Sequence, residues 1–247
     1  MELVAIYDEM EAKMASLMSA IDHRVHVGES VDDIIRDPEI QLVIEAASQK
    51  AAKYLIPKAL AAGKDVMVMS VGVFSDSNFY QEIKELSSRM RAKIYIPSGA
   101  IGGLDWIKAA SSAGLTQVTI TTRKPPAALE GSPHVVKNKI DLAAIRSPTQ
   151  IYEGPATDAA ASFPANVNVA IALSLAGIGP EKTRVRVIAD PTIERNIHEI
   201  IAEGQAGSIE LKVENLPAPT NPKTSWVAAL SAIRKLKEIV EFVSVGM

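Results

Sequence analysis

The stretch Lys93-Ile-Tyr-Ile-Pro-Ser-Gly-Ala-Ile-Gly-Gly-Leu-Asp-Trp106 decides how the chain is divided. It begins as a short apolar run typical of a strand, passes through a glycine-rich loop at 98–103 and continues in a helical pattern. A strand that feeds such a loop and then a helix leaves backbone N–H groups bare at the helix N-terminus, where an anion or a polar ligand can bind. Because the spacing is G-x-x-G-G and not G-x-G-x-x-G, a tight turn with glycines at positive φ explains it equally well.

The loop also marks a change in the pattern of the sequence. Before it, strands at 3–7, 41–47, 65–69 and 93–97 alternate with helices at 9–21, 31–36, 49–62 and 77–91. Such alternation with short connections predicts a parallel α/β sheet, whose ligands bind outside the carboxyl ends of the strands. We therefore interpret 98–103 as the junction of two domains and the floor of an active site.

The residues at these strand ends have competing interpretations. Asp8 has capping-box spacing to Glu11, but an acidic residue after the second strand of a dinucleotide fold also binds the ribose 2′-hydroxyl. Ser70 and Ser98 follow other strands. Small, hydroxylated residues there let a flat cofactor approach the backbone, or they simply suit turns.

The second half of the chain has a different pattern, in which strand-like runs dominate. Runs at 117–122, 150–153, 183–189 and 208–214 predict strands of a sheet with one solvated face. Helices are predicted at 157–163, 168–176 and 223–240. Residues 123–148 contain four prolines and predict a long loop over the site.

Composition excludes several classes of function. The chain has 247 residues, a net charge of −3 and no cysteine. We therefore expect no nucleic-acid partner, disulfide or thiolate chemistry, and a cytoplasmic protein. No apolar run approaches the ~20 residues that span a bilayer, so no membrane association is expected. The histidines lack metal-motif spacing; His23 and His26 lie in a polar segment that predicts a surface turn, so no metal site is expected.

Two segments of the second half carry chemistry. His198, in Asn196-Ile-His-Glu199, is predicted to follow a strand end, and an imidazole with a pKa near 6.5 exchanges protons at neutral pH. A lone histidine is nevertheless more often a structural residue. Asn168 opens a predicted helix, where capping is its commoner role.

Six motifs, in this order, closely resemble the L-aspartate dehydrogenase family over nearly the whole chain. They are Glu45-Ala-Ala-Ser-Gln49, Ser98-Gly-Ala-Ile-Gly-Gly-Leu-Asp105, Thr121-Thr-Arg-Lys124, Phe163-Pro-Ala-Asn-Val-Asn-Val-Ala170, Asn196-Ile-His-Glu199 and Asn221-Pro-Lys-Thr-Ser225. The resemblance implies a homodimer that oxidatively deaminates L-aspartate with NAD or NADP. The products would be iminoaspartate, then oxaloacetate and ammonia, in a reversible reaction that can feed nicotinamide cofactor synthesis.

The resemblance also implies a domain plan and residue roles. A Rossmann-type parallel sheet domain would cover 1–104, a mixed α/β catalytic and dimerisation domain 105–220, and a C-terminal helix within 221–247 would pack back on the first domain. His198 would be the catalytic acid/base. The cofactor contacts would be Ala100 and Asn168, with Asp8 and Ser70 as further candidates. The substrate candidates are Asn196, Ser98, Lys124 and Lys223, with Arg123 as a further basic candidate for the substrate carboxylates.

The chain departs from the family pattern at its start. Family members begin with a strand and a G-x-G-x-x-G turn, about 25 residues before the segment matching 3–8. We therefore expect a Rossmann-type domain that lacks its first βα unit, with weak cofactor binding by these 247 residues. Two alternatives stay open: a non-catalytic, dimer-forming remnant, and another dehydrogenase or reductase of the aspartate pathway.

Overall fold

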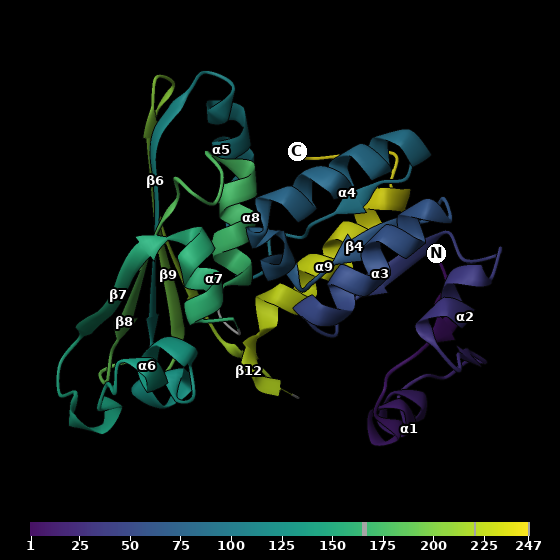
Figure 1. Cartoon of the computed structure of the whole chain (residues 1–247), viewed down its shortest axis with the longest axis horizontal. Coiled ribbons are helices and arrows are strands. Elements are labelled where there is room, and N and C mark those ends of the chain that lie inside the picture. The colour runs from purple at the N-terminus through teal and green to yellow at the C-terminus, as the bar shows by residue number, and fades with distance from the viewer. Residues whose placement is uncertain (165–166, 220, 247) are drawn as a thin grey trace. The chain divides into compact units, whose positions relative to one another are not determined.

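The computed structural model describes residues 1–164, 167–219 and 221–246, without the side chains of 222 and 223 (Figure 1). The chain forms two compact units. The first unit consists of residues 1–73 and 78–96, and the second of residues 74–77 and 97–247. The domain boundaries drawn from the sequence at 104 and 220 remain predictions.

The first unit has only parallel strand pairs, which confirms the predicted fold class. Strand β1 (Ala5–Ile6) pairs with β2 (His26–Val27), and a second sheet has the order β3-β4-β5 (Leu42–Glu45, Asp65–Val68, Ile94–Tyr95). The helices are α1 (Glu11–Ser19), α2 (Val31–Arg36), α3 (Gln49–Ala61) and α4 (Ser77–Met90). The surface turn predicted around His26 was wrong, because His26–Val27 forms strand β2. Two exposed residues are too short a run to give a strand pattern.

The ends of the helices follow from their sequences. Ser48 Oγ accepts a hydrogen bond from Ala51 N and caps α3, which ends before Gly63 at a φ of 72°. The capping box predicted for α1 does not form. Asp8 Oδ1 accepts from Met10 N, two residues on, and Met10 is the cap residue of the helix.

The second unit is a five-stranded mixed sheet with helices against one face (Figure 1). The strand order is β10-β9-β6-β8-β7 (Gly207–Asn215, Asn196–Gly204, Leu115–Lys124, Arg184–Ala189, Thr149–Pro155). Only β6 and β8 are parallel. Helices α5 (Leu104–Ser111), α7 (Ala156–Ser162) and α8 (Asn168–Ala176) lie on this face. Five consecutive buried residues make α8 the central helix of the layer.

The long loop predicted after β6 is partly helical. It contains helix α6 (Pro133–Lys137) and short helical turns at Pro126–Leu129 and Leu142–Ala144. The apolar side chains of Leu129, Val135 and Leu142 are buried and fix it to the unit. Its proline content predicted the absence of long elements but could not show these three anchors.

The C-terminal segment begins its helix later than predicted. Strands β11 (Pro217–Ala218) and β12 (Asn221–Ser225) pair, and helix α9 (Trp226–Val240) follows directly. The predicted start at 223 was wrong because that backbone is extended in β12. Packing of α9 on the first unit remains a prediction. In the described parts of the chain, no helix is both long and apolar enough to cross a membrane.

Candidate active site

His198 is the third residue of strand β9 and lies directly opposite Thr122 of β6 in an antiparallel pair. Thr122 Oγ1 and His198 Nδ1 are 3.0 Å apart, and both residues are 4 % exposed. The prediction that His198 follows a strand end was wrong. The β-branched residues Ile197, Ile200 and Ile201 carry the strand, but its polar first residues and the short turn before it concealed it.

Lys124 ends strand β6 on the same sheet face as Thr122, since side chains two residues apart share a face. It is buried and lines a cavity of about 10 Å³ together with Thr122 and apolar side chains that include Phe163, Val167 and Val187. That volume is about one water molecule, so a substrate does not fit in this cavity. Because burial penalises the ammonium, the pKa of Lys124 falls to about 8.

Burial also lowers the pKa of His198 to about 4, and the positive charge of Lys124 lowers it further in the same direction. The expected titration of His198 near neutral pH is therefore not found. At neutral pH the imidazole is uncharged while Lys124 is largely protonated. Because the His198 ring is uncharged, it does not repel the Lys124 ammonium. Burial alone therefore lowers the pKa of Lys124.

Arg123 belongs to the other face of the same sheet. Its Nε donates to both carboxylate oxygens of Glu199 at 3.2 Å, and its Nη1 lies 3.9 Å from Asp190 Oδ2. Successive residues of a strand point to opposite faces. The structure therefore separates Arg123 from Lys124 and His198, and the interpretation of Arg123 as a substrate residue loses its support.

The glycine-rich loop is fixed to this end of the second unit. Asn215 Nδ2 donates to Ala100 O at 2.9 Å, and Gly99 N donates to Ser231 Oγ of α9 at 3.1 Å. Asn215 pairs with Asn196, two residues before His198 on the same strand. Ala100 and Asn196 are thus brought to the end of β9 that carries His198. Half-buried Ser98 precedes Ala100 in the same loop.

The glycines of the loop meet a backbone requirement. Gly99 and Gly103 have φ values of 66° and 79°, a region that side chains disfavour. Gly103 is the cap residue of α5 and provides no side-chain cap, so the first N–H groups of that helix receive no side-chain bond from it. The positive φ values confirm the tight-turn interpretation of the loop, and ligand binding at the start of α5 stays a prediction.

Asn168 is the first residue of α8, and Val167 occupies the cap position. Capping through Asn168 is therefore not the role that the structure gives it. Its neighbours Ala165 and Asn166 lie outside the described residues. The side chain of Lys223 also lies outside them. The predicted contacts of Asn168 and Lys223 with ligands remain predictions.

The first unit holds a second polar cluster, around Glu45 at the carboxyl end of β3. Its buried carboxylate accepts hydrogen bonds from Ala47 N, Ser48 N, Ser70 N and Ser70 Oγ at 2.9–3.1 Å. Ser70, a predicted cofactor residue, follows β4. The carboxylate therefore joins the ends of two neighbouring strands. The motif that contains Glu45 indicates no role for this residue, because its partner across the sheet is not visible in the sequence.

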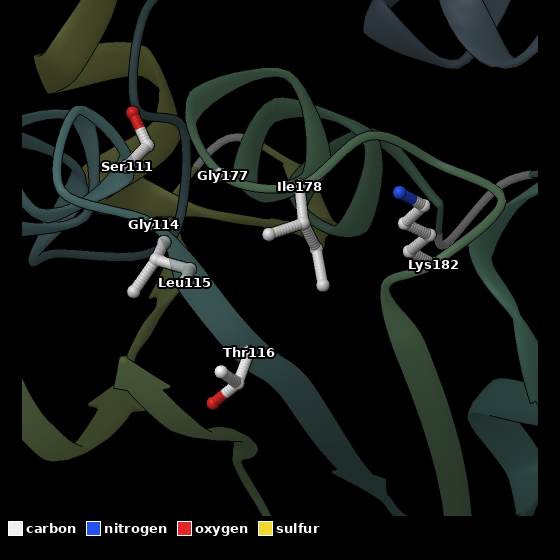
Figure 2. Close-up of a pocket in the computed structure, with 7 residues that line it drawn as sticks. All are labelled: Ser111, Gly114, Leu115, Thr116, Gly177, Ile178 and Lys182. Carbon is white, nitrogen blue, oxygen red and sulfur yellow. The ribbon is translucent and has the colours of Figure 1, made fainter. Parts of the chain in front are cut away.

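A larger cavity lies elsewhere, and Figure 2 shows its lining: Ser111, Gly114, Leu115, Thr116, Gly177, Ile178 and Lys182. It measures about 530 Å³ and opens beside the start of β6. Lys124 lies at the opposite end of this strand, eight residues from Thr116, or roughly 26 Å at about 3.3 Å per residue. The lining contains neither a histidine nor a carboxylate. The buried residues Lys124 and His198 therefore lie at the other end of β6, away from this cavity.

Two family profiles match the chain in the order of its units. The homoserine dehydrogenase NAD-binding domain matches residues 1–97, and the aspartate dehydrogenase C-terminal domain matches residues 105–239. The crystal structure of aspartate dehydrogenase from Thermotoga maritima superposes with a TM-score of 0.75, at 25 % identity and with 100 % of both chains covered. Fold and site together define a nicotinamide-dependent dehydrogenase.

Curated relatives identify the family. The L-aspartate dehydrogenase of Methanosarcina barkeri is 48 % identical over 245 residues, which cover 99 % of this chain and 90 % of the relative. That of Nitrosopumilus maritimus is 40 % identical over 236 residues, which cover 96 % and 86 %. The chain belongs to the L-aspartate dehydrogenase family, which confirms the resemblance carried by the six motifs.

Proposed function

We propose that this chain catalyses the reversible oxidative deamination of L-aspartate with NAD or NADP. The substrate would become iminoaspartate and then oxaloacetate and ammonia. The observation that carries the proposal is the buried, uncharged His198. It is hydrogen-bonded to Thr122, and the positive charge of Lys124 lowers its pKa. Perturbed ionisable groups that share one site are typical of catalysis.

The residues at the carboxyl ends of β3 and β4 fit a dinucleotide. Ala47 and Ser48 follow one strand and Ser70 and Gly72 the other, and the buried Glu45 holds both turns in place. Small side chains permit a flat ring to approach the backbone, as in other parallel α/β sheets. When bound, the nicotinamide supplies the hydride acceptor for the reaction.

The residues of the second unit would manage charge and protons. After hydride leaves the substrate Cα, water adds to the resulting imine. Uncharged His198 can accept the proton of that water at Nε2 and return it in the reverse direction. Lys124 would attract a substrate carboxylate, because an anion next to a desolvated ammonium favours its charged form.

Further features of the function are proposed on narrower grounds. Asp8 would favour NAD over NADP, because a carboxylate accepts from a 2′-hydroxyl and repels a 2′-phosphate. A homodimer and a link to nicotinamide cofactor synthesis are carried over from the family resemblance. A cytoplasmic location rests on the cysteine-free composition.

The proposal is tested by supplying L-aspartate with NAD or NADP and measuring oxaloacetate, ammonia and reduced cofactor in stoichiometric amounts. L-glutamate and D-aspartate are the control substrates, since one alters chain length and the other the position of the hydrogen at Cα. We expect turnover of L-aspartate only. Lack of turnover in both directions at millimolar cofactor would favour the non-catalytic remnant.

A further inference from the structure

Thr122 and His198 form a polar pair on a buried sheet face that Lys124 shares. They are directly opposite each other on β6 and β9, and the Oγ1–Nδ1 distance is 3.0 Å. On the same face, the next pair along the ladder is Ile120 with Ile200, both fully buried. In the described part of the chain, neither Thr122 nor His198 has another side-chain hydrogen bond. The bond fixes Nδ1 and leaves Nε2 as the ring nitrogen available to a ligand.

The chemical type of this partner matters. A carboxylate next to Nδ1 would stabilise the imidazolium, whereas a hydroxyl carries no charge and leaves the ring neutral. A hydroxyl also both donates and accepts. It can accept from Nδ1–H, which leaves a lone pair on Nε2, or donate to Nδ1, which leaves a proton on Nε2. The same hydrogen bond is therefore compatible with either neutral form of the ring.

We infer that Thr122 is a positioning residue of the reaction, whose hydroxyl holds the His198 ring by Nδ1 and lets Nε2 act as proton acceptor in one direction and as donor in the other. This inference rests on the proposed function. It adds a reason for the hydroxyl, since valine has the same shape and suits the interior of a strand equally well. If Thr122 served packing alone, its oxygen would have no consequence.

The test compares Thr122→Val, which removes the hydroxyl at constant shape, with Thr122→Ser, which keeps it. We expect Thr122→Val to lower kcat by about tenfold to a hundredfold and Thr122→Ser by less than about threefold, with the cofactor KM unchanged in both. Rescue by serine separates a role of the hydroxyl from a role of the methyl group in packing. Equal kcat in Thr122→Val and wild type would overturn the inference, as would an equal loss in both variants.

A second readout does not depend on activity. The ring nitrogens of His198 give ¹⁵N NMR signals that distinguish the neutral tautomers, and His198→Asn identifies them by difference. We expect Thr122→Val to shift these signals towards the Nε2–H form that free imidazole favours, while Thr122→Ser keeps the wild-type signals. Identical spectra for all three proteins would overturn the inference. Absence of aspartate turnover in wild type would refute the proposed function alone, because the spectra still decide whether Thr122 holds the ring.

Discussion

Two lysines are almost equally buried, one in each unit, but their surroundings differ. Lys64, in the first unit, is 6 % exposed, and its Nζ donates to Asp37 O and Ile40 O at 2.5 and 2.6 Å. Lys124, in the second unit, is 8 % exposed, and its pKa falls to about 8 through burial beside Thr122 and apolar side chains. Main-chain carbonyls fix the first ammonium in a turn. The second can lose its proton near physiological pH.

The difference shows that burial alone does not mark a functional residue. A buried cation that ends on backbone carbonyls serves the fold, because its removal leaves those carbonyls without a partner. Lys124 is a buried cation whose charged form burial penalises, next to a histidine whose pKa it lowers, and such perturbed ionisable groups are candidates for chemistry.

The largest expected effect concerns the histidine beside Lys124. His198→Asn removes the proton acceptor, and we expect kcat to fall by about 10²–10⁴ while the melting temperature changes little. Steady-state kinetics and a thermal melt check both halves. The matched control is Lys64→Met, which should keep kcat per folded molecule. A falling melting temperature with a normal kcat in His198→Asn would make His198 a packing residue.

Lys124→Met should separate stability from activity. Loss of a charged partner for the substrate carboxylate should cost about 1.5–3 kcal/mol of interaction energy. The kcat/KM for aspartate should therefore fall roughly tenfold to a hundredfold. The same change should raise the free energy of unfolding at pH 7 by up to about 3 kcal/mol, because the folded protein no longer keeps a desolvated ammonium. Urea unfolding at pH 7 measures the second effect. A less stable variant would contradict the comparison of the two lysines.

The pH dependence of Lys124 has a defined sign. Its pKa is lowered from 10.5 to about 8 in the folded protein, so the unfolded chain binds more protons between these values. Its contribution to the free energy of unfolding should therefore rise with pH across this window, by about 1.4 kcal/mol per pH unit at most. The kcat/KM for aspartate should fall over the same window as the cation is lost. Both trends should be absent from Lys124→Met, so the difference between wild type and this variant isolates the contribution of Lys124.

The reverse result is expected for Lys64→Met. Two backbone carbonyls lose their charged donor, and the free energy of unfolding should fall by about 1–3 kcal/mol. The kcat/KM for aspartate should remain within about twofold of wild type, because Lys64 makes its bonds to a turn of the first unit. Chemical denaturation measures the free energy of unfolding, and initial rates on the same preparation measure kcat/KM. Unchanged stability would show that the two carbonyl bonds do not carry the role assigned to them.

The smallest effect is expected at Asp8, which probes a cofactor function in the first unit. Asp8→Ser should shift the ratio of kcat/KM for NAD over NADP towards NADP by a few fold, about 1 kcal/mol. The loss of the Asp8 bond to Met10 N affects only the start of α1, so serine is chosen to keep an acceptor there. An unchanged ratio would leave Asp8 with its local backbone bond alone.

Much of the fold could be predicted because local sequence patterns identify most of its helices and strands. Alternation revealed β6, β8 and β10, and the charged outer faces and apolar inner faces of β8 and β10 are found in the structure. Strand β9 was missed because its polar beginning, Asn196 to Glu199, resembles a loop. The short strand β2 was missed because two residues carry no period.

The site was predictable where a motif names a residue and not where register creates a pair. His198 and Lys124 followed from motifs. Thr122 belongs to the same motif as Lys124, but its role depends on facing a residue 76 positions away. Asn215 was missed for the same reason, since it reaches Ala100 across 115 positions. Such pairings are set by the tertiary fold, as are the pKa changes that follow from burial.

The carboxylate of Glu45 has a consequence for the timing of local motions. It accepts from the amides of Ala47, Ser48 and Ser70, which belong to turns after two different strands. An amide proton can exchange with deuterium only after its hydrogen bond opens. Because the two oxygens of one carboxylate serve all three amides, a single displacement of the Glu45 side chain frees them together. These amides should therefore exchange at matched rates, as one cooperative unit, although they are up to 23 positions apart in the chain.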